Sequence, residues 1–217
     1  MQIIWHGQAC FQIISGRGKE EKLTIVIDPF SEEIGLKLPK LEADILLISH
    51  DHYNHNNKRA IWGKPFLVEG PGEYEIKGVF IQGIEADHDK SQGKERGKIT
   101  VFTIEAEEMR LCHLGDFGQR ELTPEQLEKI GDIDILMIPV GGIYAISARE
   151  ASKVISQIEP RLVIPMHYQL PKLKIKLESL NKFLQTIGQK VIEPQNKLTI
   201  KKGELPEEKM KIVILKP

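Results

Sequence analysis

Short apolar runs, each ending at a polar or small residue, recur along the chain. Runs of this length that end at a turn signal are typical of buried strands. Because a sheet fixes the loops that follow its strands, we expect the residues at these stops to gather at one end of a sheet. The runs cover residues 23–27, 45–48, 109–112, 135–138 and 162–164, and they stop at Asp28, His50, His113 with Asp116, Gly141 and His167.

Three segments carry helical signals. The first begins with a capping-box pattern, in which Thr123 is the N-cap, Pro124 is at the first helical position and Gln126 is the capping-box glutamine. The pair Ser147 and Glu150 repeats the capping-box pattern. A third segment has apolar residues at helical spacing and ends at a glycine. The predicted helices cover residues 123–130, 147–158 and 177–187.

Residues 66–105 return to an alternation with period two. Glycine and proline at 70–72, and the glycine at 77–78, mark turns, so we predict a β-meander there. The last stretch, 197–217, predicts two more strands around a turn at 203–206. Strands mixed with three helices predict an α/β fold, with α and β layers packed on each other.

The composition is that of an ordinary water-soluble protein. Apolar residues make up 41% of the 217 residues and charged residues 28%, and no apolar run approaches the length of a membrane span. No linker divides the chain, so we predict a single domain over 1–217. The chain starts directly in a strand-like segment without a secretory signal, which predicts cytoplasmic residence.

Cysteine content and net charge bear on disulfide bonds and on the expected binding partners. Cys10 and Cys112 are the only cysteines and lie in apolar segments, which favours reduced, buried thiols over a disulfide framework. The net charge of −1 predicts no general attraction to nucleic acid or to an anionic membrane. The expected partner is a small-molecule substrate, and the sequence leaves a homo-oligomer open.

Residues 50–55 read His-Asp-His-Tyr-Asn-His and hold three of the seven histidines. Alternation along an extended chain puts His50 and His52 on the same side, where two imidazoles can bind one cation. His55 is then left to face a second cation. A polar loop that is rich in histidine by chance is the alternative, but three histidines within six residues favour a metal site.

The later candidates complete a known series of ligands. The ligands of the metallo-β-lactamase superfamily follow the order His-x-His-x-Asp-His, then His, then Gly-Asp, then a late His. This chain resembles that series, with His88, Asp116 and His167 in the last three places. More closely, the chain resembles the small stand-alone hydrolases near ascorbate 6-phosphate lactonase. The resemblance implies a four-layer αββα sandwich. The matching segments are Trp-His-Gly-Gln-Ala-Cys-Phe at 5–11, Ile-Asp-Pro-Phe at 27–30, Ser-His-Asp-His at 49–52 and Pro-Met-His-Tyr at 165–168.

The resemblance also implies the roles of these residues. One or two zinc ions, or manganese, would activate water for hydrolysis of an ester, lactone or phosphoester. Asp116 would bridge the two ions, and Asp116 and His167 would take part in catalysis. Asp28 would accept an N–H from a ligand imidazole. The first ion would be held by His50, His52 and His88, and the second by position 54, His55 and His167.

Three positions depart from the family pattern or stay ambiguous. Asn54 stands where relatives have an aspartate, and an uncharged amide should weaken the second metal site. Gln8 takes the place of a histidine next to Gly7. His113 would face away from Asp116 along an extended strand, so it would support the ligands from behind or pack in the core rather than bind metal.

The flanking residues have two interpretations. Residues 90–98 carry four basic residues, including Arg96, and would close over an anionic substrate or form a solvated loop. Tyr53 and Tyr168 would donate to a reacting oxygen or only pack.

A metal-binding sensor or scaffold that lost catalysis through Asn54 is the alternative function. The balanced charge and short chain disfavour a nuclease.

Overall fold

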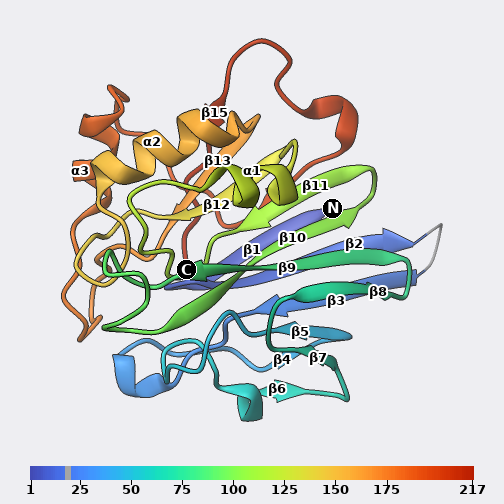
Figure 1. Cartoon of the computed structure of the whole chain (residues 1–217). Helices are drawn as coiled ribbons and strands as arrows, with labels where there is room; N and C mark the ends of the chain where they lie inside the picture. The colour runs from blue at the N-terminus through green and yellow to red at the C-terminus, as the bar shows by residue number, and fades with distance from the viewer. Residues whose placement is uncertain (18–20) are drawn as a thin grey trace.

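The computed structural model describes residues 1–17 and 21–217, and two β-sheets packed face to face form its centre (Figure 1). The first sheet has the order β14 (Leu198–Thr199), β1 (Gln2–Gly7), β2 (Cys10–Arg17), β3 (Glu21–Ile27), β5 (Ile45–Leu47) and β7 (Phe66–Val68). The second has the order β15 (Lys211–Ile212), β13 (Leu162–Met166), β12 (Ile135–Pro139), β11 (Met109–His113), β10 (Lys98–Ala106), β9 (Val79–Asp87) and β8 (Gly72–Ile76). A small separate sheet pairs β4 (Leu41–Glu42) with β6 (Ile61–Trp62).

Three α-helices lie on the side of the second sheet (Figure 1). They are α1 (Pro124–Ile130), α2 (Ala148–Ile158) and α3 (Leu180–Thr186). The connections between β3 and β7 instead carry the 3-10 turns η1 (Glu32–Ile34) and η2 (Lys58–Ala60), and a third turn, η3 (Lys202–Glu204), precedes β15. None of the described helices is long and apolar enough to cross a membrane. The predicted layered α/β architecture is therefore present.

The first two predicted helices start where their caps indicated. Both capping boxes form, Thr123 with Gln126 and Ser147 with Glu150. The third helix starts later than predicted, at Leu180 instead of residue 177. The N–H of Leu177 donates to the side chain of Gln169, and the next N–H donates to a loop carbonyl, so this backbone is bound outside the helix.

The predicted meander over 66–105 is correct only from β8 onward. β7 pairs in parallel with β5 in the first sheet, and the chain then crosses to the second sheet, where β8, β9 and β10 are antiparallel neighbours. The last two strands also separate, because β14 pairs with β1 and β15 pairs with β13. An alternation of apolar and polar residues indicates which face of a sheet each side chain occupies. It does not indicate which sheet the strand joins.

The five apolar runs end at one edge of the molecule, but they belong to two sheets and not to one. β3 and β5 are parallel neighbours in the first sheet. β11, β12 and β13 are parallel in the second. Parallel strands bring their carboxyl ends to the same edge, and the two edges meet where the sheets pack. The loops after these strands therefore come together from both sheets.

Candidate metal centre

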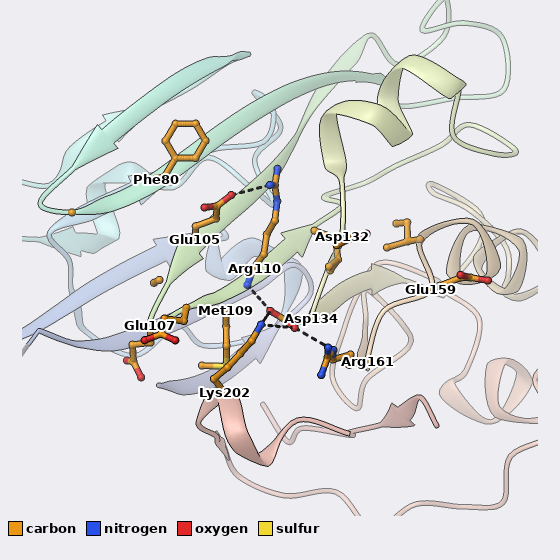
Figure 2. Close-up of a pocket in the computed structure, with 15 residues that line it drawn as sticks. Phe80, Glu105, Glu107, Met109, Arg110, Asp132, Asp134, Glu159, Arg161 and Lys202 are labelled. Carbon is orange, nitrogen blue, oxygen red and sulfur yellow. Dashed lines mark hydrogen bonds and ion pairs between the residues drawn. The ribbon is translucent and has the colours of Figure 1, made fainter. Parts of the chain in front are cut away.

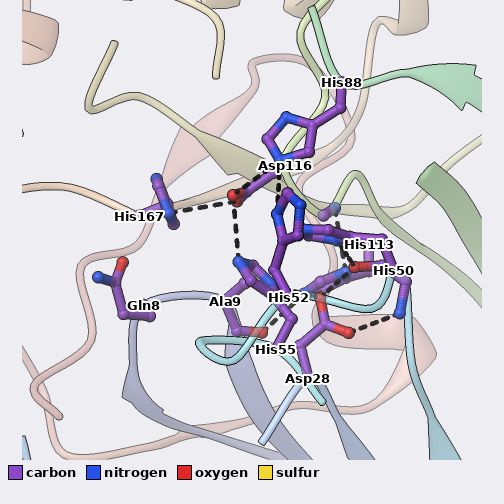
Figure 3. A network of polar contacts seen from close by, with 12 residues as sticks. Gln8, Ala9, Asp28, His50, His52, His55, His88, His113, Asp116 and His167 are labelled. Carbon is purple, nitrogen blue, oxygen red and sulfur yellow. Dashed lines mark hydrogen bonds and ion pairs between the residues drawn. The ribbon is translucent and has the colours of Figure 1, made fainter. Parts of the chain in front are cut away.

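Five histidines and one aspartate converge at this shared edge (Figure 3). The loop after β5 supplies three of the histidines, and the loops after β9, β11 and β13 supply one residue each. Every predicted ligand except Asn54 has a ring nitrogen or carboxylate in the cluster. The residues are His50, His52 and His55, then His88, Asp116 and His167.

The first group consists of His50, His52 and His88. One ring nitrogen from each lies within 4.8 Å of the others. Nδ1 of His52 is 3.3 Å from Nε2 of His88. Two nitrogens on a tetrahedral zinc ion, each at about 2.0–2.1 Å from the metal, are separated by roughly 3.3–3.4 Å. This pair therefore has the spacing of two ligands on one ion.

The carboxylate of Asp116 faces the remaining histidines. Its Oδ2 is 3.1 Å from Nε2 of His55 and its Oδ1 is 3.2 Å from Nε2 of His167. Oδ2 also lies 3.7 Å from Nε2 of His88, which belongs to the first group. Asp116 thus stands between two groups of imidazoles, as a bridging ligand would.

Several of these atoms are buried without a hydrogen-bond partner among the described residues. They include Nε2 of His50, and also Nε2 of His167 and Oδ1 of Asp116, which lie 3.2 Å apart but do not have the geometry of a hydrogen bond. Buried polar atoms are nearly always satisfied, so a cluster of unpaired donor atoms indicates a ligand. Imidazole nitrogens with one carboxylate form a donor set that suits zinc, and manganese accepts the same types of atom. The residues present therefore fit a metal.

One buried carboxylate orients two of the imidazoles. Asp28 Oδ2 lies 3.0 Å from Nδ1 of His55, and its two oxygens accept the N–H of Ser49 at 2.7 Å and the hydroxyl of Ser49 at 2.6 Å. Since that hydroxyl proton points to the carboxylate, Ser49 Oγ accepts the Nδ1–H of His50 at 2.9 Å. Both histidines are then left with Nε2 free to bind metal. The sequence reasoning assigned Asp28 correctly in position but missed Ser49.

We expect Ser49→Ala to weaken metal binding at the first group by about 10–100-fold, because His50 would lose the contact that fixes its tautomer and ring orientation. Competition with a chromophoric chelator measures this dissociation constant. Ser156→Ala is the matched control, since its hydroxyl donates only to a carbonyl one turn back in α2. Equal metal affinity in wild type and Ser49→Ala would show that His50 needs no such support.

Electrostatics keep the cluster in metal-binding protonation states, with one exception. Burial would raise the pKa of Asp116, but His167 and His55 outweigh it and hold the pKa well below its usual range. Burial also lowers the pKa of His50, and His55 lowers it further. The same burial would lower the pKa of His55, yet Asp116 and Asp28, one beside each ring nitrogen, raise it to about 10. Without metal, the ring of His55 is therefore protonated between these two carboxylates, and an ion bound at Nε2 would replace the proton that faces Asp116.

Two glycines allow loops to approach the ligand backbones. A Cβ on Gly118 would lie 2.2 Å from the carbonyl carbon of His88, and one on Gly141 would lie 2.1 Å from the carbonyl oxygen of His167. No rotamer can relieve a clash between a Cβ and backbone. His167 itself has a φ of 52°, in the left-handed region that is unfavourable for a non-glycine residue. Tertiary contacts therefore fix its conformation.

Gln8 lies beside His167, and its side-chain amide is fully buried (Figure 3). The backbone carbonyl oxygen of Gln8 accepts from Nε1 of Trp5 at 2.8 Å and from the N–H of His167 at 3.1 Å. Both atoms of the amide lack a partner within the described part of the chain. This side chain was missed as a buried group, because the sequence pattern carries no signal for an unpaired amide.

His113 lies in the core and does not reach the ligands. Its Nε2 lies 2.9 Å from the carbonyl oxygen of Ala9, and its Nδ1 accepts the N–H of Gly115 at 3.2 Å. The ring packs edge-on against Phe11. Of its two predicted roles, packing in the core is the one that its contacts support. Tyr168 likewise packs on another side chain, that of Trp5, at 5.1 Å between ring centroids.

A cavity of about 560 Å³ opens onto the cluster. His52, His88 and Asp116 are at its floor, and Asn54, which is 8% exposed, also lines it. Tyr53 lines the cavity and is 53% exposed. A substrate can therefore reach the floor from solvent. The other lining residues are Arg96, Tyr144, Lys174, Ile175 and Lys176.

A larger cavity of about 820 Å³ lies at the opposite ends of β11, β12 and β13 (Figure 2). Each of its three basic groups pairs with an acid of the lining. Arg110 contacts Glu105 at 2.8 Å, and Asp134 contacts Lys202 at 2.9 Å and Arg161 at 3.5 Å. Its basic groups are thus already engaged, and neither candidate metal group lies among the described residues that line it, so size alone does not make this cavity the functional site.

Comparison with known proteins agrees with the fold and the cluster. The family model of the beta-lactamase superfamily domain matches residues 2–167. A solved structure from Thermotoga maritima, described as a Zn-dependent hydrolase of the metallo-beta-lactamase superfamily, is 36% identical with a TM-score of 0.78, and the match covers 99% of this chain and 98% of that one. The chain therefore belongs to the metallo-β-lactamase superfamily and has its mixed α/β fold.

Sequence relatives narrow the family. The UPF0173 metal-dependent hydrolase of Thermoplasma volcanium is 30% identical over 199 residues, covering 77% of this chain and 83% of the relative. The UPF0173 metal-dependent hydrolase of Thermococcus onnurineus is 29% identical over 232 residues, covering 93% and 96%. Within the superfamily, the chain belongs to the UPF0173 metal-dependent hydrolase family. The finer similarity to ascorbate 6-phosphate lactonase stays a prediction.

Proposed function

We propose that this protein is a metal-dependent hydrolase that acts on an ester, lactone or phosphoester of a small molecule. The observation that carries the proposal is the convergence of five imidazoles and Asp116 beside a cavity, which His52, His88 and Asp116 line. The names of the relatives support metal-dependent hydrolysis as the class of reaction. The resemblance to ascorbate 6-phosphate lactonase favours a lactone or a phosphoester among the three.

The two groups of side chains would divide the metal ions between them. Zinc, or manganese in its place, would lower the pKa of water and so supply a nucleophile at neutral pH. Asp116, ionised and between the groups, would bridge the ions and orient that water. His167, whose Nε2 lies next to Asp116, would contact the reacting group of the substrate. His50, His52 and His88 would hold the first ion, and Asn54, His55 and His167 the second.

We further propose a single domain over 1–217 and cytoplasmic residence. One continuous hydrophobic core that joins both sheets supports the first. Cys10 and Cys112 are both free and buried, and burial raises the pKa of the Cys112 thiol to about 12. Thiols held protonated in this way suit a reducing compartment.

Metal content tests the proposed function directly. We expect purified wild type to carry zinc, or manganese after growth with manganese, and we expect His50→Ala and His88→Ala each to lose the ion of the first group. Elemental analysis after gel filtration measures this content. His6→Ala is the control, because His6 lies on β1 and contacts Gln12 outside the cluster.

Unchanged metal content in both variants would reject the assignment of the first group. Metal content that follows the prediction without turnover of any ester, lactone or phosphodiester would instead favour the sensor or scaffold. The two measurements together thus separate the enzyme from a metal-binding protein without catalysis.

A further inference from the structure

We propose that the cavity above the metal centre contains a recognition site for a carboxylate or phosphate group of the substrate, formed by Arg96 with Lys174 and Lys176. The proposal rests on the proposed function, since it names the class of molecule on which the same site acts. The substrate would then be a small organic anion whose charged group lies a few bonds away from the scissile bond.

The charges that line the cavity have one dominant sign. Arg96 comes from the loop after β9, while Lys174 and Lys176 come from the segment between β13 and α3. Among the lining residues, Asp116 is the only acid, and it belongs to the metal centre. Two separate segments thus place three cations around one opening, and such a rim attracts and retains anions.

The loop that carries Arg96 is held in place by one carboxylate. Asp89 accepts four backbone N–H groups, those of Ser91 at 2.7 Å, Gly93 at 3.0 Å, Glu95 at 3.0 Å and Arg96 at 2.8 Å. These contacts make residues 89–96 a fixed cradle. The two interpretations of the sequence, a segment that closes over the substrate and a solvated loop, both stay predictions.

Arg96 itself is positioned but not neutralised. Its guanidinium carbon lies 4.7 Å from the ring centroid of Tyr144, which also lines the cavity. No ion pair involves Arg96 in the described ranges, 1–17 and 21–217, whereas Lys90 of the same loop pairs with Glu150 at 2.7 Å. A stacked guanidinium keeps its N–H groups free and loses little entropy when it binds two oxygens of an anion.

Arg96 lines the same cavity as His52 and His88, which belong to the first group of metal ligands. The anionic group of the substrate would therefore lie in the part of the cavity that these residues share. The exposed face of Tyr53 and the half-buried Ile175 line the same cavity and offer apolar surface to the organic part of the molecule.

A matched set of esters tests the proposal in the metal-loaded enzyme. 4-Acetoxybenzoate and 4-acetoxyphenyl phosphate carry a carboxylate and a phosphate, and 4-acetoxybenzamide is neutral with the same acetyl ester. We expect wild type to prefer at least one anionic ester over the amide by about 10-fold or more in kcat/KM, which is the contribution of a charge-assisted hydrogen bond. The preferred anion tells carboxylate from phosphate.

The variants assign the preference to Arg96. We expect Arg96→Gln to bring the ratio of kcat/KM values close to one, whereas Lys94→Gln, in the same exposed loop but outside the cavity lining, should keep the wild-type ratio. Equal kcat/KM for charged and neutral esters in wild type would overturn the anion site while leaving the hydrolase intact. So would the same loss of preference in both variants.

A binding measurement decides the question if wild type turns over none of the esters, in which case the proposed function itself has failed on these substrates. Calorimetric titration of the metal-loaded proteins with phenylphosphonate should give a dissociation constant about 10-fold higher in Arg96→Gln than in Lys94→Gln. Equal constants in the two variants would overturn the anion site.

Discussion

Replacing Asp116 with asparagine should lower kcat at least about 10²-fold while the fold survives, in the range seen when a group that stabilises or positions the reacting species is removed. The carboxylate contacts His55 at 3.1 Å and His167 at 3.2 Å, and its low pKa keeps it ionised at neutral pH. Asparagine keeps the shape and removes the charge. Steady-state kinetics on an ester that wild type turns over measure the change in kcat. A thermal melt of each protein shows whether the fold survives.

Asp51→Asn is the matched control, because Asp51 lies within the same histidine motif but is exposed and bonds to Asn56. It should keep activity close to wild type. Full activity in Asp116→Asn would rule out the role of Asp116 and weaken the assignment as a hydrolase. A collapsed melting curve would point instead to a structural role for this buried carboxylate.

The secondary structure was predictable wherever its signal is local. The caps at Thr123 and Ser147 start helices because their side chains bond within one turn, and no distant residue is needed. The partners of a strand are decided by tertiary contacts. β7 therefore could not be assigned to β5 from its own alternation, and the start of α3 moved because Leu177 bonds to Gln169.

The convergence of the candidate ligands was predictable because histidine and aspartate are chemically distinctive residues, and here they follow strands that end at one edge of the molecule. The residues that position them were not. Ser49 looks like any serine until its hydroxyl is found between Asp28 and His50. Gly118 looks like a turn residue until the backbone of His88 is found against it. Such roles depend on contacts between segments that are distant in the sequence, and a single sequence does not record them.

Replacing Asn54 with aspartate should tighten binding of the second metal ion at least about 10²-fold and raise any hydrolytic rate. Two divalent cations beside the single carboxylate of Asp116 leave a large positive charge in a site where Asn54 is 8% exposed and His55 is fully buried. A carboxylate at position 54 would offset part of that charge, and an amide cannot. In wild type we therefore expect a tightly held first ion and a loosely held second one.

Titration of the metal-free protein with zinc, followed by calorimetry and elemental analysis, counts the ions and gives both dissociation constants. Asn56→Asp is the control, since it adds the same charge to the same loop and its side chain bonds to Asp51 instead of lining the cavity. If it tightens the second ion as much as Asn54→Asp does, the effect is general electrostatics and position 54 is not a ligand. If wild type already binds two ions with matched affinity, the amide of Asn54 is a competent ligand and the charge argument is wrong.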